Sequence, residues 1–291
     1  MSPNESRAEQ AEAFLVARPL PAPGPSKRDR GEIVVIGGAA RSPGAALIAG
    51  RAALRVGAGR LTIALAASVA AAAAVSMPES GVVPLAETSA GSIRGRGIAA
   101  VARDLGTADA VLVGPGLDDI EETRRLVRRL HSALAPRATL VLDAYVLGAI
   151  AGRPRRVAGQ AAILTPNSDE AAVLLGGRFT DAAVDTVKIA RRYRAVVSCN
   201  GWVADQHGRL VLVGDGGPGL GTSGSGDALA GAIAGLAARG CDPLQAAVWG
   251  TYLHVAAGRT LAREYAPLGF LASEIVDRFA VEMNAADRTS S

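Results

Sequence analysis

The sequence contains little of several residue types, and each shortage narrows the classes of protein that it can encode. Aromatic residues make up 3% of the 291 residues, and the only cysteines are Cys199 and Cys241. Two cysteines without metal-ligand spacing provide neither a disulfide framework nor a zinc site, so we expect no metal held by protein side chains and a reducing, cytoplasmic location. With so few aromatics, the core must consist of alanine, valine, leucine and isoleucine.

Lysine is equally scarce, and the net charge of +4 is carried by arginines scattered along the chain. No basic block is interleaved with aromatic residues, so no nucleic-acid partner is expected. No run of about 18 strongly apolar residues is present, and no basic segment precedes an apolar one at the N-terminus. The sequence therefore predicts neither a membrane span nor a signal peptide, whereas an anionic small molecule suits the charge.

The abundant residues predict one large α/β domain. Hydrophobic residues make up 49% of the chain and charged residues 20%, which allows a sizeable core. Residues 1–30 are polar and proline-rich, so we expect an N-terminal arm that is partly disordered, with a short helix at 9–16. Residues 31–291 are expected to form a single catalytic domain.

Short apolar runs alternate with stretches of helical periodicity along this domain. The alternation predicts a three-layer α/β/α fold, with a mostly parallel sheet covered by helices on both faces. The expected strands span residues 33–36, 61–65, 82–85, 110–113, 139–142, 162–164, 195–198, 202–205 and 210–213. The expected helices span residues 45–56, 68–77 with Ser68 as N-cap, 98–105, 121–134, 168–175, 181–193, 228–239, 244–265 and 273–283. We expect Arg124, Arg125, Arg128 and Arg129 to form a solvated helix face.

Polar or glycine-rich residues follow the expected strands at five places. They are residues 37–38, 114–116, Asp143, 165–167 and 221–227. Because ligands bind at the carboxyl ends of the strands in such sheets, we expect these residues to surround one site. Asp143 and Asn167 are therefore candidate substrate-binding residues.

The most informative stretch is Gly-Thr-Ser-Gly-Ser-Gly-Asp at residues 221–227, followed by a helical run. A helix start presents unpaired N–H groups and the positive end of the helix dipole, and glycine lets a phosphate approach the backbone. The candidate phosphate-binding residues are Thr222, Ser223, Gly224, Ser225 and Gly226. An aspartate beside a bound anion suits a general acid or base, so Asp227 is the candidate catalytic residue. The alternative is an ordinary glycine-rich turn that begins a helix with Asp227.

The order and spacing of these segments give the chain a wider resemblance. The segments are Gly-Glu-Ile-Val-Val-Ile-Gly-Gly at 31–38, Pro-Gly-Ala at 43–45 with residues 52–59, Val-Gly-Pro-Gly-Leu at 113–117, Leu-Asp-Ala at 142–144, Leu-Thr-Pro at 164–166, Gly-Ser-Gly-Asp-Ala-Leu-Ala-Gly at 224–231 and Tyr-Leu-His at 252–254. Over about residues 27–281, the chain resembles the ADP/ATP-dependent NAD(P)H-hydrate dehydratase family of the ribokinase-like superfamily. Residues 1–30 are too short for the N-terminal epimerase domain that this family frequently carries, so none is expected.

The resemblance implies an activity, cofactors and site residues. The family phosphorylates the ring hydroxyl of hydrated NADH or NADPH and then eliminates phosphate, with ADP or ATP and Mg²⁺. Gly226 matches a nucleotide contact, Asp227 matches the catalytic acid/base, and Ala45 and Gly116 match contacts to the hydrate. Cys199 and Asn200 lie near the position of a family lysine-glycine pair and are possible nucleotide contacts. A homo-oligomer is implied, with a tetramer favoured.

Three departures from the family pattern leave alternative functions open. Tyr145 stands where the family usually has a second aspartate, Asn167 stands for a histidine, and no lysine lies near Asn200. The first two favour a ribokinase-like kinase of another small hydroxyl compound, with Asp227 as base. The missing lysine favours a catalytically weak nucleotide-binding paralogue with a regulatory role. His254 is expected to pack in a helix rather than to take part in catalysis.

Overall fold

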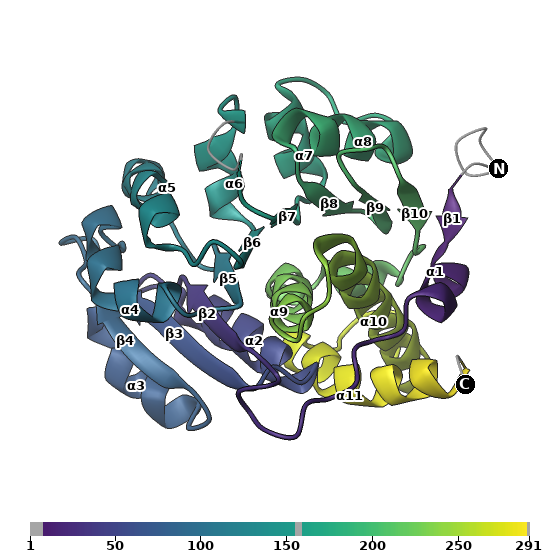
Figure 1. Cartoon of the computed structure of the whole chain (residues 1–291), viewed down its shortest axis with the longest axis horizontal. Helices are drawn as coiled ribbons and strands as arrows, with labels where there is room; N and C mark the ends of the chain where they lie inside the picture. Colours follow the sequence, from purple (N-terminus) through teal and green to yellow (C-terminus); the bar gives the residue numbers. More distant parts are fainter. Residues whose placement is uncertain (1–7, 155–158, 290–291) are drawn as a thin grey trace.

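A computed structural model describes residues 8–154 and 159–289, and within them ten strands form one sheet (Figure 1). Only β9 runs against its neighbours, β8 and β10; every other pair of adjacent strands is parallel. In their order across the sheet the strands are β1 (Glu9–Gln10), β10 (Leu210–Leu212), β9 (Trp202–Ala204), β8 (Val196–Cys199), β7 (Ala162–Leu164), β6 (Thr139–Leu142), β5 (Ala110–Val113), β2 (Glu32–Ile36), β3 (Arg60–Ala66) and β4 (Gly81–Leu85).

The strands are buried on both faces because successive side chains enter two separate cores. In β2, Ile33 and Val35 belong to one hydrophobic cluster, whereas Val34 and Ile36 belong to the other. The uninterrupted β-branched run of this strand therefore reflects burial on both sides. This arrangement confirms the predicted three-layer α/β/α fold with a mostly parallel sheet.

Helices cover both faces of the sheet and leave the strand ends to loops (Figure 1). The helices of one layer are α1 (Ala11–Ala17), α2 (Pro43–Arg55), α9 (Ser225–Ala238), α10 (Pro243–Glu264) and α11 (Ala272–Thr289), with α3 (Ala70–Ser76) beside β4. The other layer contains α4 (Ala102–Leu105), α5 (Ile120–Ala133), α6 (Tyr145–Ile150), α7 (Ser168–Leu175) and α8 (Ala182–Tyr193). Short 3-10 turns are η2 (Ala67–Val69), η3 (Gly95–Val101) and η5 (Pro218–Gly221).

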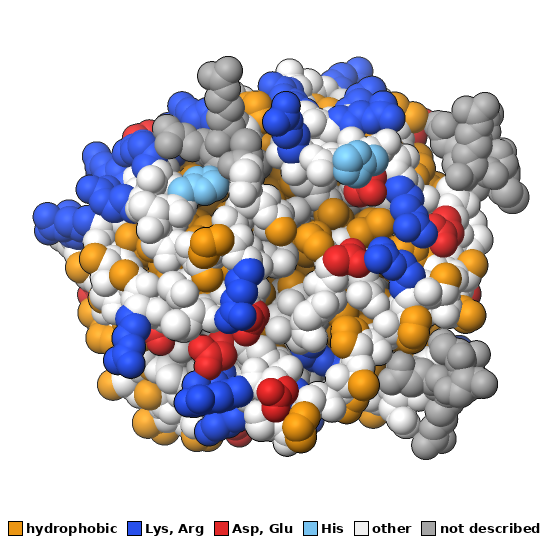
Figure 2. All heavy atoms as spheres, viewed as in Figure 1, with side chains coloured by type: hydrophobic (Ala, Val, Ile, Leu, Met, Phe, Trp, Pro, Cys, Tyr) orange, Lys and Arg blue, Asp and Glu red, His pale blue; other side chains and the backbone are white. Residues whose placement is uncertain are grey.

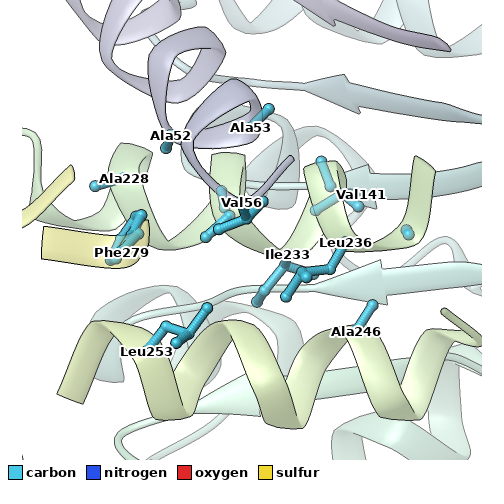
Figure 3. Close-up of a cluster of buried hydrophobic side chains, with 14 of the residues drawn as sticks. Ala52, Ala53, Val56, Val141, Ala228, Ile233, Leu236, Ala246, Leu253 and Phe279 are labelled. Carbon is cyan, nitrogen blue, oxygen red and sulfur yellow. The ribbon is translucent and has the colours of Figure 1, made fainter. Parts of the chain in front are cut away.

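Helix α9 is the central helix of its layer, and small residues allow it to lie close to α2. A Cβ added to Gly231 would lie 2.1 Å from the carbonyl oxygen of Ala49, and one added to Gly235 would lie 2.6 Å from that of Ala53. Figure 3 shows Ala52 and Ala53 of α2 above α9, with Leu253 of α10 below it. Helix α9 also packs against β2, β5 and β6, and its first turn lies near the carboxyl end of β6, since the charge of Asp227 acts on Asp143, the residue that follows this strand.

Residues 8–30 lie against the α9–α10 layer. Strand β1 extends the sheet beside β10, and Phe14 of α1 is fully buried. Trp249 of α10 donates its indole N–H to the carbonyl oxygen of Arg18 at 2.9 Å, and Arg18 forms an ion pair with Asp242. The disorder expected for the arm falls partly on residues 1–7, which lie outside the described residues.

Three local features differ from the sequence-based expectations. Ser68 does not cap the alanine-rich helix; it lies in η2 and donates to a carboxylate oxygen of Glu87 at 2.9 Å, and α3 begins only at Ala70. Residues 98–105 do not form one α-helix: they comprise the end of η3 and the four-residue α4, and Gly95 at the start of η3 lies against α5. Helix α6, directly after Asp143, was not expected because it is only six residues long.

The arginines of α5 form the solvated helix face that the sequence predicts. Arg125, Arg128 and Arg129 of α5 are exposed and Arg124 is half-buried; Figure 2 shows basic side chains gathered at the edge of the molecule over this helix. In the described part of the chain, no helix combines the length and apolar character needed to cross a membrane.

Candidate active site

The candidate site is built from loops that follow β2, β5, β6, β7 and β8, together with the start of α9. The first two loops are joined by backbone hydrogen bonds: the N–H of Gly38 donates to the carbonyl of Pro115 at 2.8 Å, and that of Ala39 to the carbonyl of Gly116 at 2.9 Å. A Cβ on Gly116 would lie 3.2 Å from the Cβ of Ala45. The structure therefore brings together the two residues matched to hydrate contacts.

The next loop places a buried carboxyl group behind the site. Asp143 is 4% exposed, and the hydroxyl of Thr165 donates to its Oδ1 at 2.6 Å. Burial, followed by the charge of Asp227, raises the pKa of Asp143 well above its ordinary value, although the bond from Thr165 acts in the opposite direction. Close packing also requires glycine at position 114, where a Cβ would lie 1.9 Å from the carbonyl oxygen of Asp143.

Backbone strain follows immediately at Ala144. This residue has φ 51° and ψ −125°, a conformation that an L-amino acid adopts at a cost of about 1–3 kcal/mol. It turns the chain sharply from β6 into α6, so that Asp143 stays beneath the site. Tyr145, at the first position of α6, is 40% exposed.

The loop before α9 has the features of an anion site. Gly224 has φ 86° and forms the N-cap, so that Ser225 begins the helix; Thr222 and Ser223 precede it in the same loop. A Cβ added to Gly226 would meet no atom within 4 Å. The first-turn N–H groups of α9 therefore border open space, at the positive end of the helix dipole.

Asp227 lies in this first turn and is half-buried. Burial and, after it, the charge of Glu170 raise the pKa of Asp227 to about 6. Burial also raises the pKa of Glu170. A carboxylate with a pKa near neutrality can accept a proton from an attacking hydroxyl and release it again, so Asp227 has the properties of a general base.

A cavity of about 550 Å³ lies on one side of Gly226, a volume typical of small-molecule sites. Leu220, Leu229 and Val255 supply apolar lining, and Thr165, Ser198 and Thr251 supply hydroxyl groups. Other lining residues are Pro166, Asn167, Asn200, Gly201, Gly214, Asp215, Gly216, Ser225 and His254. The cavity thus combines an apolar wall with polar groups beside the helix start.

Of the candidate residues that follow β7 and lie at the end of β8, Asn167 and Asn200 line the cavity and Cys199 does not. Asn167 lines the cavity, but its side-chain oxygen accepts the N–H of Glu170 at 2.9 Å in a capping box at the start of α7. Asn200 also lines the cavity and donates to the hydroxyl of Ser168 at 2.8 Å. Cys199 does not line it: its thiol is packed in the hydrophobic cluster on the α5–α8 side, and burial raises its pKa to about 12. Any nucleotide contact by Cys199 would have to come from its backbone.

One polar pair in this wall was not expected as part of the site. Nε2 of His254, on α10, lies 2.8 Å from the hydroxyl oxygen of Ser225 at the start of α9, and both residues are buried. Burial lowers the pKa of His254 to about 4, so the ring is neutral at physiological pH. The Tyr-Leu-His motif marked this histidine, but the 29 residues between the partners gave no sign of the contact.

Among the described residues, no group of three or more histidine, cysteine or carboxylate side chains converges on a point where a metal ion could be held. A phosphate-bound Mg²⁺ fits such a site, because Mg²⁺ commonly keeps several waters and binds through the substrate phosphates with few protein ligands.

The sheet order and the helical layers on both faces of the sheet are those of the ribokinase-like fold. A ribokinase-like superfamily protein from Enterococcus faecalis has a TM-score of 0.77 and 20% identity, with 96% of each chain covered. The NAD(P)H-hydrate dehydratase family model matches residues 33–280, and the chain therefore belongs to that family.

Two relatives within the family cover nearly the whole chain. The ADP-dependent (S)-NAD(P)H-hydrate dehydratase of Xanthomonas campestris is 46% identical over 272 residues, which are 90% of this chain and 91% of that protein. The ADP/ATP-dependent NAD(P)H-hydrate dehydratase of Bacillus subtilis, crystallised with ATP and Mg²⁺, has a TM-score of 0.78 and 25% identity, with 98% and 99% of the chains covered. The chain spans about half the length of the bifunctional repair enzymes that it also matches.

Proposed function

We propose that this chain restores NADH or NADPH from their hydrates in a nucleotide-dependent dehydration, a reaction of nicotinamide nucleotide repair. The observation that carries the proposal is the pairing of Asp227, with a pKa of about 6, and the open backbone at Gly226 in the first turn of α9. Family membership and the 46% identity with an ADP-dependent (S)-NAD(P)H-hydrate dehydratase support this assignment.

The chemistry requires two steps at one hydroxyl group. In the first, the hydroxyl oxygen of the hydrated ring attacks the terminal phosphorus of the nucleotide, a new P–O bond forms, and the bond to the nucleotide breaks. Asp227 accepts the hydroxyl proton as this oxygen loses it. In the second step, the ring C–O bond breaks, phosphate leaves with the bonding electrons, and loss of a proton from the adjacent carbon restores the double bond.

The helix start supports the first step by stabilising negative charge. The N–H groups in the first turn of α9 would donate to phosphate oxygens, and the open space at Gly226 gives them access. Thr222, Ser223, Gly224 and Ser225 complete the phosphate loop. The phosphates of the nucleotide would hold Mg²⁺ beside this loop, and the ion would supply positive charge to neutralise the transferring group.

On the substrate side, Ala45 and Gly116 form a surface of small residues near the loop at Gly38, on which the hydrated nicotinamide would lie. Burial raises the pKa of Asp143, which favours the protonated carboxyl, and in that form Asp143 would donate a hydrogen bond toward Asp227 or a bound phosphate. Asn167 lines the cavity beside Gly226, and because its side-chain oxygen is occupied in the α7 cap, its side-chain nitrogen is the group that would contact the substrate. These four residues are the proposed hydrate contacts.

Two features of the site favour activities other than the proposed dehydration. Tyr145, exposed at the strand end, favours a kinase that phosphorylates another hydroxyl compound with Asp227 as base. The absence of a lysine at the cavity (the only lysines are Lys27 and Lys188) favours a weak nucleotide-binding paralogue.

An absorbance assay distinguishes these functions. The chain is incubated with hydrated NADH, Mg²⁺ and either ADP or ATP, and the absorbance of reduced nicotinamide is followed. We expect recovery with wild type and its loss in Asp227→Asn. Nucleotide turnover without recovery would replace the proposal with the kinase, and nucleotide binding with neither activity would replace it with the inactive paralogue.

We infer that the chain forms a homo-oligomer. Tyr265, Leu268 and Leu271, between α10 and α11, are each more than 60% exposed and lie close together in sequence, which is the type of apolar surface that subunit contacts cover. Light scattering after size exclusion tests this inference: a mass of about 29 kDa, that of one chain, would contradict it.

A further inference from the structure

We propose that His254 is a positioning residue for the phosphate site: it holds the hydroxyl of Ser225 so that this group donates to a phosphate of the bound nucleotide. The inference rests on the proposed nucleotide-dependent function. It concerns a contact between two helices that the family resemblance did not assign.

The first observation is the position of the pair. Ser225 is the first residue of α9, directly before Gly226, and it is 3% exposed. Its hydroxyl oxygen lies 2.8 Å from Nε2 of His254, which is 8% exposed. Both residues line the cavity beside the helix start. The buried polar pair therefore lies at the wall of the cavity, next to the first-turn N–H groups of α9 that would bind a phosphate.

The second observation is the chemistry of the two groups. The His254 ring is surrounded by protein and makes no ion pair within residues 8–154 and 159–289, so it is neutral and carries one N–H group. A serine hydroxyl has one proton to donate and two lone pairs. If Nε2–H donates to the Ser225 oxygen, then the hydroxyl proton is free for an anionic acceptor.

A phosphate oxygen is the acceptor that makes this arrangement most favourable. Hydrogen bonds to an ionised acceptor are about twice as strong as those between neutral groups. With a nucleotide present, the Ser225 hydroxyl should therefore point to the phosphate, and His254 should act only as its donor. The role of His254 is thus to fix the direction of the Ser225 hydroxyl before the nucleotide arrives, which reduces the ordering required on binding.

A double-mutant cycle measures this coupling directly. Dissociation constants for ADP with Mg²⁺ are measured by calorimetry for wild type, Ser225→Ala, His254→Leu and the double variant. We expect each single change to weaken binding about tenfold, since each removes a hydrogen bond to a charged acceptor or its orientation. In the double variant, His254→Leu should add less than about twofold, because there is no longer a hydroxyl to direct.

Two further variants separate this role from a purely structural one. His254→Gln retains an N–H donor and should keep ADP affinity within about threefold of wild type. Trp249→Phe removes a different hydrogen bond of α10, the partly buried one to Arg18, and should lower stability with unchanged ADP affinity.

The outcomes distinguish this inference from the proposed function. If wild type binds no ADP, the proposed nucleotide-dependent function is refuted, and the role of His254 is refuted with it. If wild type binds ADP and His254→Leu binds it equally well, or if the losses in the two single variants simply add in the double variant, the positioning role of His254 is refuted while the proposed function stands.

Discussion

Asp227→Asn should make the protein more stable while it removes activity. In the folded chain, burial and the charge of Glu170 raise the pKa of Asp227 from 3.8 to about 6. The folded state therefore binds the proton more tightly than the unfolded chain does. This preference favours folding fully below about pH 4, and it is lost as the pH rises through about 6. At about pH 7, the ionised carboxylate opposes folding, and an asparagine would not.

The size of the effect follows from the two pKa values. Their difference of about 2.2 corresponds to about 3 kcal/mol, at about 1.4 kcal/mol for each tenfold change in proton affinity. Because Asp227 is only half-buried, contact with solvent reduces this figure to about 1–2 kcal/mol. Asp227→Asn also removes the negative charge that opposes ionisation of Asp143, and this second effect likewise stabilises the folded variant.

Urea denaturation at about pH 7.5 and about pH 4 measures the free energy of unfolding of the variant and of wild type. We expect a gain of about 1–2 kcal/mol at the higher pH and none at the lower. Asp118→Asn is the matched control, because Asp118 is exposed and its side chain makes no hydrogen bond within the described part of the chain. This variant should change stability by less than about 0.5 kcal/mol at both pH values. Equal stability of Asp227→Asn and wild type at pH 7.5 would refute the reasoning.

The remaining predictions concern glycine and capping positions. Gly226→Ala enters open space on a helical backbone, so it should leave folding intact and weaken ADP binding about tenfold or more, measured by calorimetry. Gly231→Ala places a Cβ 2.1 Å from the Ala49 carbonyl and should cost about 1–3 kcal/mol in urea denaturation; equal stability of the two glycine variants would contradict the α2–α9 packing. Asn167→Ala removes the capping box with Glu170 and should cost about 1 kcal/mol, whereas Asn167→Asp should not; equal losses in both would exclude a capping role.

The sequence predicts the layers of this fold well because local pattern and tertiary position agree. Residues 33–36 are β-branched throughout and lie in a strand buried on both faces. The failures come where a contact elsewhere in the chain decides the local structure. Ser68 has the chemistry of an N-cap, but its hydroxyl donates a hydrogen bond to Glu87 on another segment, and the helix begins later. Helix α6 is too short to show a helical period.

In the candidate site too, the sequence predicts what neighbouring residues determine and does not predict what distant contacts determine. The position of Asp227 could be predicted because glycines, aspartate and helix follow one another in sequence. Its pKa could not, because this depends on burial and on Glu170, which a different loop supplies. Likewise, the sequence marks His254 by its motif, but its contact with Ser225 exists only after α10 packs beside α9.

The most direct test of the proposed function is the stoichiometry of the reaction. Hydrated NADH, ADP and Mg²⁺ are incubated with the chain, and reduced nicotinamide and inorganic phosphate are measured in the same sample. Phosphorylation followed by elimination predicts one reduced nicotinamide for each phosphate released, with neither formed by Asp227→Asn. Phosphate release without NADH recovery, or recovery of NADH without consumption of ADP, would contradict the proposed function.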